Sequence, residues 1–100
     1  MVKHIVMWKF KDIAEGKSKD ENISIATDML YSLVGKISEI KKMDIGKDIS
    51  CTAASMDMVL LTEFDSTDTL KAYAVHPEHV KVADFIKKVV ESRVVLDYDM

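Results

Sequence analysis

The stretch VKHIVMWKFK, residues 2–11, alternates its side chains in a way that decides how the chain folds. Successive side chains of a β-strand point to opposite sides, so a strand over these residues has two distinct faces. One face receives a histidine and the larger apolar side chains, namely Val2, His4, Val6, Trp8 and Phe10. The other face still carries Ile5 and Met7 among its lysines, so the strand offers apolar surface on both sides.

A helix is expected soon after this strand. Residues 12–17, DIAEGK, are predicted as a loop. Ser18 with Glu21 three residues later has the pattern of a capping box, which marks the start of a helix. The helix is predicted to run to about Val34, since Gly35 suits the left-handed conformation that often follows a helix. Its expected apolar stripe is Ile23, Ala26, Leu30, Leu33 and Val34.

The rest of the chain is expected to add three strands and two helices. The strands are predicted at residues 41–49, 56–64 and 92–98, with helices starting at Asp65 or Ser66 and at Pro77. Proline restricts the residue before it and suits the first turn of a helix, so His76 should end one helix where Pro77 begins the next.

This order of elements predicts the α+β class. The expected architecture is a ferredoxin-like antiparallel four-stranded sheet with helices on one face. Residues 1–100 are expected to form a single domain.

The sheet face without helices should be polar in a monomer, but the sequence predicts an apolar one. Strand alternation gathers these side chains there: Ile5, Met7, Val59, Leu61, Val94, Leu96 and Tyr98. Exposed apolar patches beyond a few hundred Å2 generally mark an interface. We therefore expect a homodimer that packs through its open sheet faces, a dimeric α+β barrel. The alternatives are that loops cover this face, or that the assignment of side chains to the two faces is shifted by one residue.

Composition excludes several classes of partner. The formal net charge is −3, and the lysines are spread along the chain and interleaved with acids, whereas a nucleic-acid binder needs a basic face. No apolar run approaches the ~20 residues that span a bilayer, so no membrane partner is expected. Cys51 is the single cysteine, which suits a reducing compartment, and we expect a cytoplasmic protein.

Three histidines are the main candidates for chemistry. His79 falls in the first turn of the helix that starts at Pro77, where backbone N–H dipoles favour a neutral imidazole that can act as a base. Tyr73 precedes it on the other side of the proline bend, so the two side chains can converge. Tyr73 is equally explained as a core residue, and His76 as a helix cap.

His4 and Asp97 are expected on the helix-facing side of the sheet. A buried imidazole needs a hydrogen-bond partner, and a carboxylate on that side can hold one ring in one tautomer. A satisfied core histidine is the alternative explanation for His4. His76 and His79 are spaced i and i+3, but no third ligand has a matching spacing, so no metal site is expected.

Several segments carry a family resemblance. They are VKHIVMWKFK, GKDI at 46–49, LLTEFDS at 60–66, AYAVHPEHVKVADF at 72–85 and VVLDYD at 94–99. Together they resemble the stress-responsive A/B barrel domain (Dabb) family over nearly the whole chain. This resemblance implies a ferredoxin-like dimeric α+β barrel, in agreement with the two apolar faces of the sheet.

The resemblance also implies site residues. One plant branch looks like a polyketide cyclase, which closes a poly-β-keto chain by an aldol step without metal or cofactor. Its tyrosine and histidine near the HPxH turn correspond to Tyr73 and His79, its strand-one histidine to His4, and the aspartate that orients the histidine to Asp97. A pocket tyrosine of that branch is replaced by Leu30, which makes this pocket less polar.

We therefore expect a mostly apolar pocket between sheet and helices. Its candidate residues are His4, Val6, Trp8, Leu30, Leu60, Tyr73, His79, Phe85 and Asp97. One hypothesis is a non-catalytic protein that binds a small apolar or aromatic molecule without a cofactor, or that serves as a stress-associated structural dimer. The alternative is a metal-free, cofactor-independent aldol-type cyclase that uses Tyr73 and His79. A third hypothesis, a haem-degrading monooxygenase, shares the dimeric barrel architecture and requires a histidine on the haem.

Overall fold

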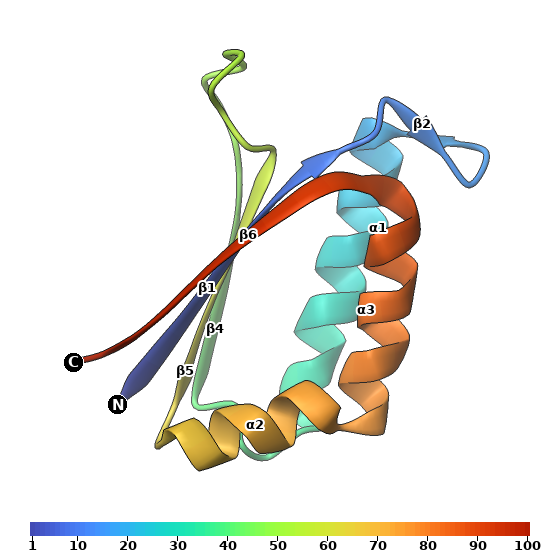
Figure 1. Ribbon diagram of the computed structural model, residues 1–100. Coiled ribbons are helices and arrows are strands. Elements are labelled where there is room, and N and C mark those ends of the chain that lie inside the picture. Colours follow the sequence, from blue (N-terminus) through green and yellow to red (C-terminus); the bar gives the residue numbers. More distant parts are fainter.

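The computed structural model describes residues 1–100 and shows an antiparallel sheet with helices packed on one face (Figure 1). The main elements are β1 (Val2–Phe10), α1 (Lys19–Ser32), β4 (Lys42–Lys47), β5 (Met58–Phe64), α2 (Thr67–Val75), α3 (Pro77–Val89) and β6 (Val90–Asp99). The four strands lie in the order β4-β5-β1-β6, and every neighbouring pair is antiparallel. The predicted ferredoxin-like α+β fold is confirmed.

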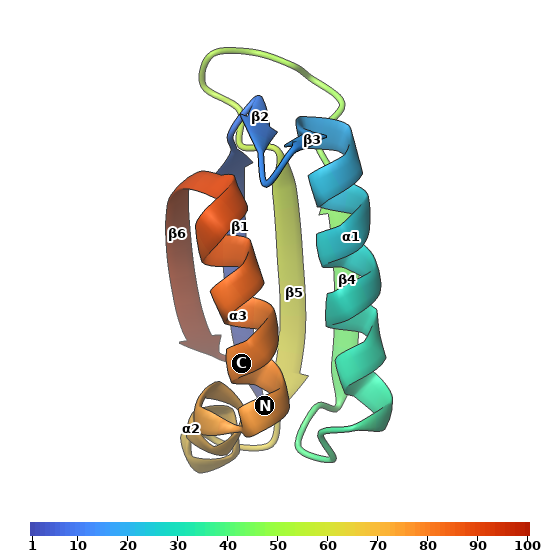
Figure 2. The ribbon, with the colours of Figure 1, turned by 90° about the vertical axis from the view of Figure 1, so that its right-hand side faces the viewer.

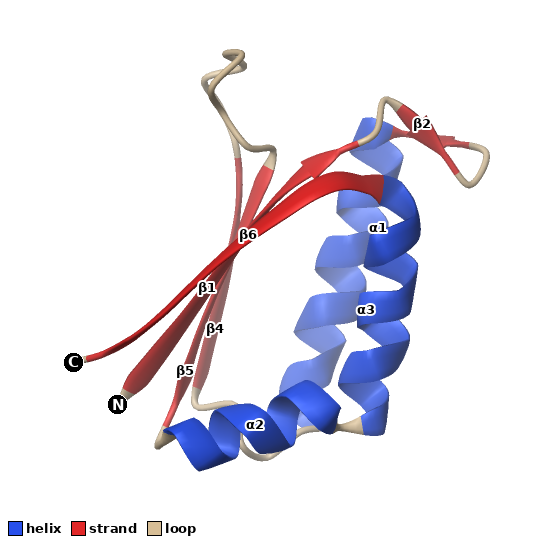
Figure 3. Ribbon diagram, viewed as in Figure 1, coloured by secondary structure: helices blue, strands red, loops and turns tan.

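The helices form a single layer. Figure 2 shows α1 and α3 side by side in front of the sheet, and Figure 3 shows that no helix covers the opposite face. The shorter α2 lies across one end of the space between sheet and helices (Figure 1). None of the three α-helices has the length and apolarity that crossing a membrane requires.

Local capping explains where the helices start. The Ser18 hydroxyl accepts a hydrogen bond from the backbone N–H of Glu21, and the Glu21 carboxylate accepts one from the Ser18 N–H, as predicted. Ser66 caps α2 in the same way with Thr69. At the proline, His76 has extended backbone angles, and its Nδ1 accepts a hydrogen bond from the Glu78 N–H at 3.1 Å. The predicted break at His76-Pro77 is therefore confirmed.

The core lies between the sheet and the helices. It contains the strand faces that the sequence predicted to point toward the helices. The buried strand residues include Val6, Trp8, Phe10, Met58, Leu60 and Phe64. They pack against Ile23, Ala26, Leu30 and Leu33 of the first helical segment and Val82, Ile86 and Val89 of α3. The alternation of β1 and β5 therefore determines which side chains meet the helices.

Two local predictions were wrong. The predicted loop contains a small hairpin, β2 (Ile13–Ala14) and β3 (Lys17–Ser18), because Glu15 and Gly16 have φ of 52° and 74°, as a tight hairpin turn requires. Gly35 does not adopt a left-handed conformation. The chain after α1 tightens into a 3-10 turn, Leu33–Gly35, and the Lys36 N–H donates to the Leu33 carbonyl at 3.0 Å.

The helix-free face of the sheet carries the predicted apolar side chains. The register of β1 and β6 pairs Ile5 with Leu96 and Met7 with Val94, so these residues share that face. Leu96 and Val94 are 59% and 52% exposed. We call this surface the open face, defined by Ile5, Met7, Val59, Leu61, Val94, Leu96 and Tyr98.

Candidate functional site

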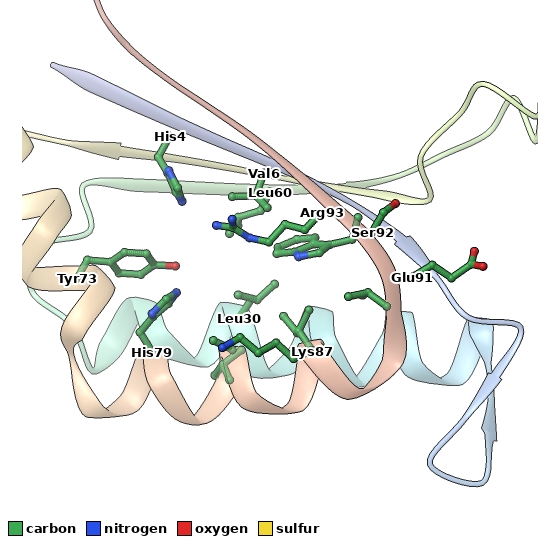
Figure 4. Close-up of a pocket in the computed structure, with 15 residues that line it drawn as sticks. His4, Val6, Leu30, Leu60, Tyr73, His79, Lys87, Glu91, Ser92 and Arg93 are labelled. Atoms are coloured by element: carbon green, nitrogen blue, oxygen red, sulfur yellow. The ribbon is translucent and has the colours of Figure 1, made fainter.

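A cleft of about 430 Å3 lies between the sheet and helices α2 and α3 (Figure 4). Most of its wall is apolar and comes from Val6, Trp8, Leu30, Leu60, Val82 and Ile86. Tyr73, His79 and His4 gather at one end, whereas Glu91 and Ser92 lie toward the other (Figure 4). The cleft therefore combines an apolar body with a polar end, as small-molecule sites generally do.

His79 is positioned by the first turn of α3. Its Nδ1 lies 3.0 Å from the carbonyl oxygen of Ala74. A carbonyl can only accept, so Nδ1 of the neutral ring carries the proton and Nε2 keeps its lone pair. Burial lowers the pKa of His79 from its ordinary value of 6.5, and the charges of His4, Arg93 and His76 lower it further against the Ala74 hydrogen bond. The ring is therefore a neutral base at pH 7.

Tyr73 comes from α2 and is only 1% exposed. Its ring lies 4.3 Å from the ring of His79, centroid to centroid. Its hydroxyl has no hydrogen-bond partner in the protein, and Figure 4 shows it directed between His4 and His79. Burial raises the pKa of Tyr73 to about 12, with Arg93 opposing the shift. The hydroxyl thus remains protonated at neutral pH and is available as a donor.

His4 is held by Asp97 from the neighbouring strand. The β1–β6 register pairs these two residues directly, and the Asp97 carboxylate accepts from Nδ1 of His4. The rings of His4 and Tyr73 lie 6.3 Å apart. The resemblance implied that Asp97 orients His79, but the structure pairs Asp97 with His4, and the Ala74 carbonyl holds His79.

Most of the predicted pocket residues line this cleft. His4, Val6, Trp8, Leu30, Leu60, Tyr73 and His79 do so. Phe85 does not line it, and is instead a partly buried side chain packed against the core. Asp97 stands behind His4 and does not line the cleft itself.

The sequence prediction missed the lining residues from the second half of α3 and the start of β6, and the charged residue nearest the polar end among them is Arg93. It lines the cleft from β6, opposite Trp8 in the strand register. Alternation along the last strand was the available signal, since Arg93 shares a face with Val95 and Asp97. No three His, Cys, Asp or Glu side chains gather in a way that could hold a metal ion.

Known proteins similar to this chain include two from plants. The chain is 29% identical to olivetolic acid cyclase of Cannabis sativa over 99 residues, which covers 97% of this chain and 94% of the cyclase. It is 27% identical to the stress-response A/B barrel domain-containing protein DABB1 of Arabidopsis thaliana, covering 98% of this chain. The match spans only 46% of DABB1, so the chain corresponds to about half of that protein.

A solved structure and a family model also match this chain. A dimeric protein of unknown function with a ferredoxin-like fold from Bacteroides fragilis is 31% identical, with a TM-score of 0.81. The superposition covers 99% of this chain and 95% of that one. The model of the Stress Responsive A/B Barrel Domain (Dabb) matches residues 2–100. The chain therefore belongs to the stress responsive A/B barrel domain family.

Proposed function

We propose that this protein binds a small aromatic or keto compound in the cleft between the sheet and the helices. The observation that carries the proposal is the Tyr73 hydroxyl, which is buried, directed into the cleft and without a partner in the protein. A buried hydroxyl without a hydrogen bond is unfavourable by roughly 1–3 kcal/mol. A ligand with a carbonyl or hydroxyl oxygen at this point removes that penalty, because it supplies the missing acceptor.

The rest of the cleft supports a ligand with a flat apolar body. Its volume of about 430 Å3 falls in the range of small-molecule sites. Trp8 is 5% exposed and Leu60 is 2% exposed, so the apolar wall is preformed. Binding therefore needs little rearrangement of the core, which limits the entropy lost on association.

A thermal-shift screen with aromatic ketones, phenols and short poly-keto compounds tests this proposal. A compound present at about 100 times its Kd should stabilise the protein by about 2.7 kcal/mol. Tyr73→Phe should weaken the binding of each compound that stabilises the wild type. Tyr31→Phe should not, because the Tyr31 hydroxyl lies elsewhere and accepts a hydrogen bond from the backbone N–H of Ile45. Stabilisation that is unaffected by Tyr73→Phe would place the ligand elsewhere, against the proposal.

Acid–base catalysis of a cyclase type is a second candidate, favoured by the contact of Tyr73 with His79. Neutral Nε2 of His79 is a base, and the protonated Tyr73 hydroxyl is a donor beside it. The similarity to olivetolic acid cyclase supports the same reaction class. These groups suit the cofactor-independent aldol closure of a linear keto chain.

The proposed step balances within one substrate molecule. Nε2 of His79 removes a proton from the carbon between two carbonyls, while the Tyr73 hydroxyl donates a hydrogen bond to the developing enolate oxygen. The enolate carbon attacks a second carbonyl of the same chain, forming one carbon–carbon bond. The resulting alkoxide takes the proton back from the imidazolium of His79.

Product analysis by mass spectrometry, with a linear poly-keto substrate, separates catalysis from binding. His79→Ala should remove turnover while leaving binding of a stable aromatic hit largely in place. His76→Ala is the matched control, because His76 caps α3 and does not line the cleft. Binding without any cyclised product would contradict catalysis and leave ligand binding as the function.

We further propose that the functional unit is a homodimer formed through the open face. Its side chains remain half-exposed, and fully burying them is worth about 1.5–3 kcal/mol each. Because about half of their surface is already covered, the gain is roughly 5–10 kcal/mol per subunit before the losses on association. The Bacteroides fragilis protein is described as dimeric, which supports the same assembly here.

Sedimentation equilibrium of two charge variants tests the dimer. Leu96→Glu places a carboxylate on the open face, beside Ile5 in the strand register, and should give the 11.3 kDa monomer. Ile49→Glu introduces the same charge at a loop residue that is 94% exposed, and it should leave the dimer intact. A wild-type protein that remains monomeric at micromolar concentration would overturn this assembly.

A further inference from the structure

The cleft contains the only arginine in the chain, Arg93. Figure 4 shows its guanidinium nitrogens directed toward the end of the cleft that holds His4 and Tyr73. The β1–β6 register places Arg93 opposite Trp8, on the helix-facing side of the edge strand. The same face continues to Val95 and Asp97, and Asp97 is the partner of His4.

Arg93 forms no ion pair with any carboxylate of the chain. It also makes no hydrogen bond through its guanidinium, whereas the structure contains ten ion pairs between other cationic groups and carboxylates. An arginine side chain is a planar fork with five donors, and it is used where a carboxylate or phosphate must be bound at two points. The fork of Arg93 is free for such a contact.

The charge of the cleft differs from that of the whole molecule. The chain carries a net charge of −3, yet the cleft is lined by the cations Arg93 and Lys87 against a single acid, Glu91. The charge of Arg93 also acts at the polar end, where it contributes to lowering the pKa of His79 and opposes the raised pKa of Tyr73. The lining of the cleft is therefore more cationic than the molecule as a whole, which favours an anionic ligand there.

We propose that the ligand is an aromatic or keto acid whose carboxylate is bound by Arg93. This inference rests on the proposed ligand-binding function and names its substrate class. The flat body of the acid lies against Trp8 and Leu60, and its ring hydroxyl or keto oxygen accepts from Tyr73. A carboxylate matches the guanidinium fork in geometry, and the charge-assisted pair it forms is stronger than a neutral hydrogen bond.

Arg93 then sets the specificity of the cleft for acids over their neutral analogues. A neutral amide or ester of the same shape keeps the apolar contacts but loses the charge-assisted bonds. Each such bond is worth about 1.5–3 kcal/mol, so the acid should bind about 10-fold or more tightly than its amide. An aromatic phosphate presents an anion of different size and tests whether the site prefers carboxylate.

Isothermal titration calorimetry with the ring-hydroxylated forms of naphthoate, naphthamide and naphthyl phosphate makes this comparison. The variants are Arg93→Gln and Arg93→Lys, and the matched control is Lys71→Gln, which removes one positive charge from an exposed position of α2 outside the cleft. Far-UV circular dichroism and thermal unfolding of each variant check that the fold is retained. Wild type and Lys71→Gln should prefer naphthoate over naphthamide by about 10-fold or more.

In Arg93→Gln this preference should fall to about 1, whereas Arg93→Lys should keep part of it because the charge remains without the fork. An unchanged preference in a folded Arg93→Gln variant overturns the inference. Equal binding of naphthoate and naphthamide to wild type overturns it as well, but leaves the ligand-binding function standing. Binding of neither compound counts against both, and tighter binding of naphthyl phosphate overturns the choice of a carboxylate.

Discussion

Replacing Tyr73 by phenylalanine should stabilise the protein without ligand and weaken its function. The tyrosine is 1% exposed, and its hydroxyl is buried without a hydrogen-bond partner in the protein. Leaving such a group unpaired is unfavourable by about 1–3 kcal/mol, whereas phenylalanine fills almost the same volume. Tyr73→Phe should therefore raise the free energy of unfolding by about 1 kcal/mol, which corresponds to a Tm higher by about 4–8 °C for a chain of this size.

Thermal unfolding followed by circular dichroism measures this change. Wild type and variants must be compared at one protein concentration, because a dimer unfolds at a temperature that depends on concentration. Tyr31→Phe is the matched control. Its hydroxyl is on a side chain that is 45% exposed and accepts from the Ile45 N–H at 3.2 Å, so its removal should leave Tm equal or slightly lower.

The result that refutes the reasoning is a Tyr73→Phe protein that is less stable than wild type. That outcome would mean that the hydroxyl is already satisfied in the free protein, and it would remove the main support for a ligand at this point. A more stable variant that has lost affinity for aromatic hits would instead show that the site keeps an unfavourable hydroxyl for the sake of binding.

Three further predictions concern the histidines and a helix cap. The pKa of His79 is lowered in the folded state from its ordinary value of 6.5. As the pH falls below 6.5, the unfolded chain therefore binds more protons than the folded one, and part of the free energy of unfolding should be lost. His79→Gln should lack that part when urea unfolding is compared between about pH 7.5 and about pH 5. An identical pH dependence in wild type and variant would contradict the shift. Asp97→Ala should destabilise the protein by about 1 kcal/mol, because His4 loses its acceptor, whereas Asp97→Asn keeps an oxygen there and should cost less by the same urea measurement. Ser66→Ala removes the side-chain acceptor for the Thr69 N–H and should lower the stability by about 1 kcal/mol in a thermal melt, and no change would mean that this cap is unimportant.

Local patterns in the sequence were sufficient for most of the architecture. The alternation in residues 2–11 identified the buried face of β1, and Ser18, Ser66 and the His76-Pro77 pair located the helix starts. These features depend on neighbours within a few residues, through the period of a strand or the unpaired N–H groups of a helix end. The apolar open face followed from the same alternation.

The contacts of the candidate site were decided by the tertiary structure. His4 and Asp97 are 93 residues apart, and only the register of two paired strands brings them together. The same register, and not any local signal, places Arg93 in the cleft opposite Trp8. Strand alternation limits a side chain to one of two faces, but its partner across the sheet is set by how strands far apart in the sequence align when the core closes.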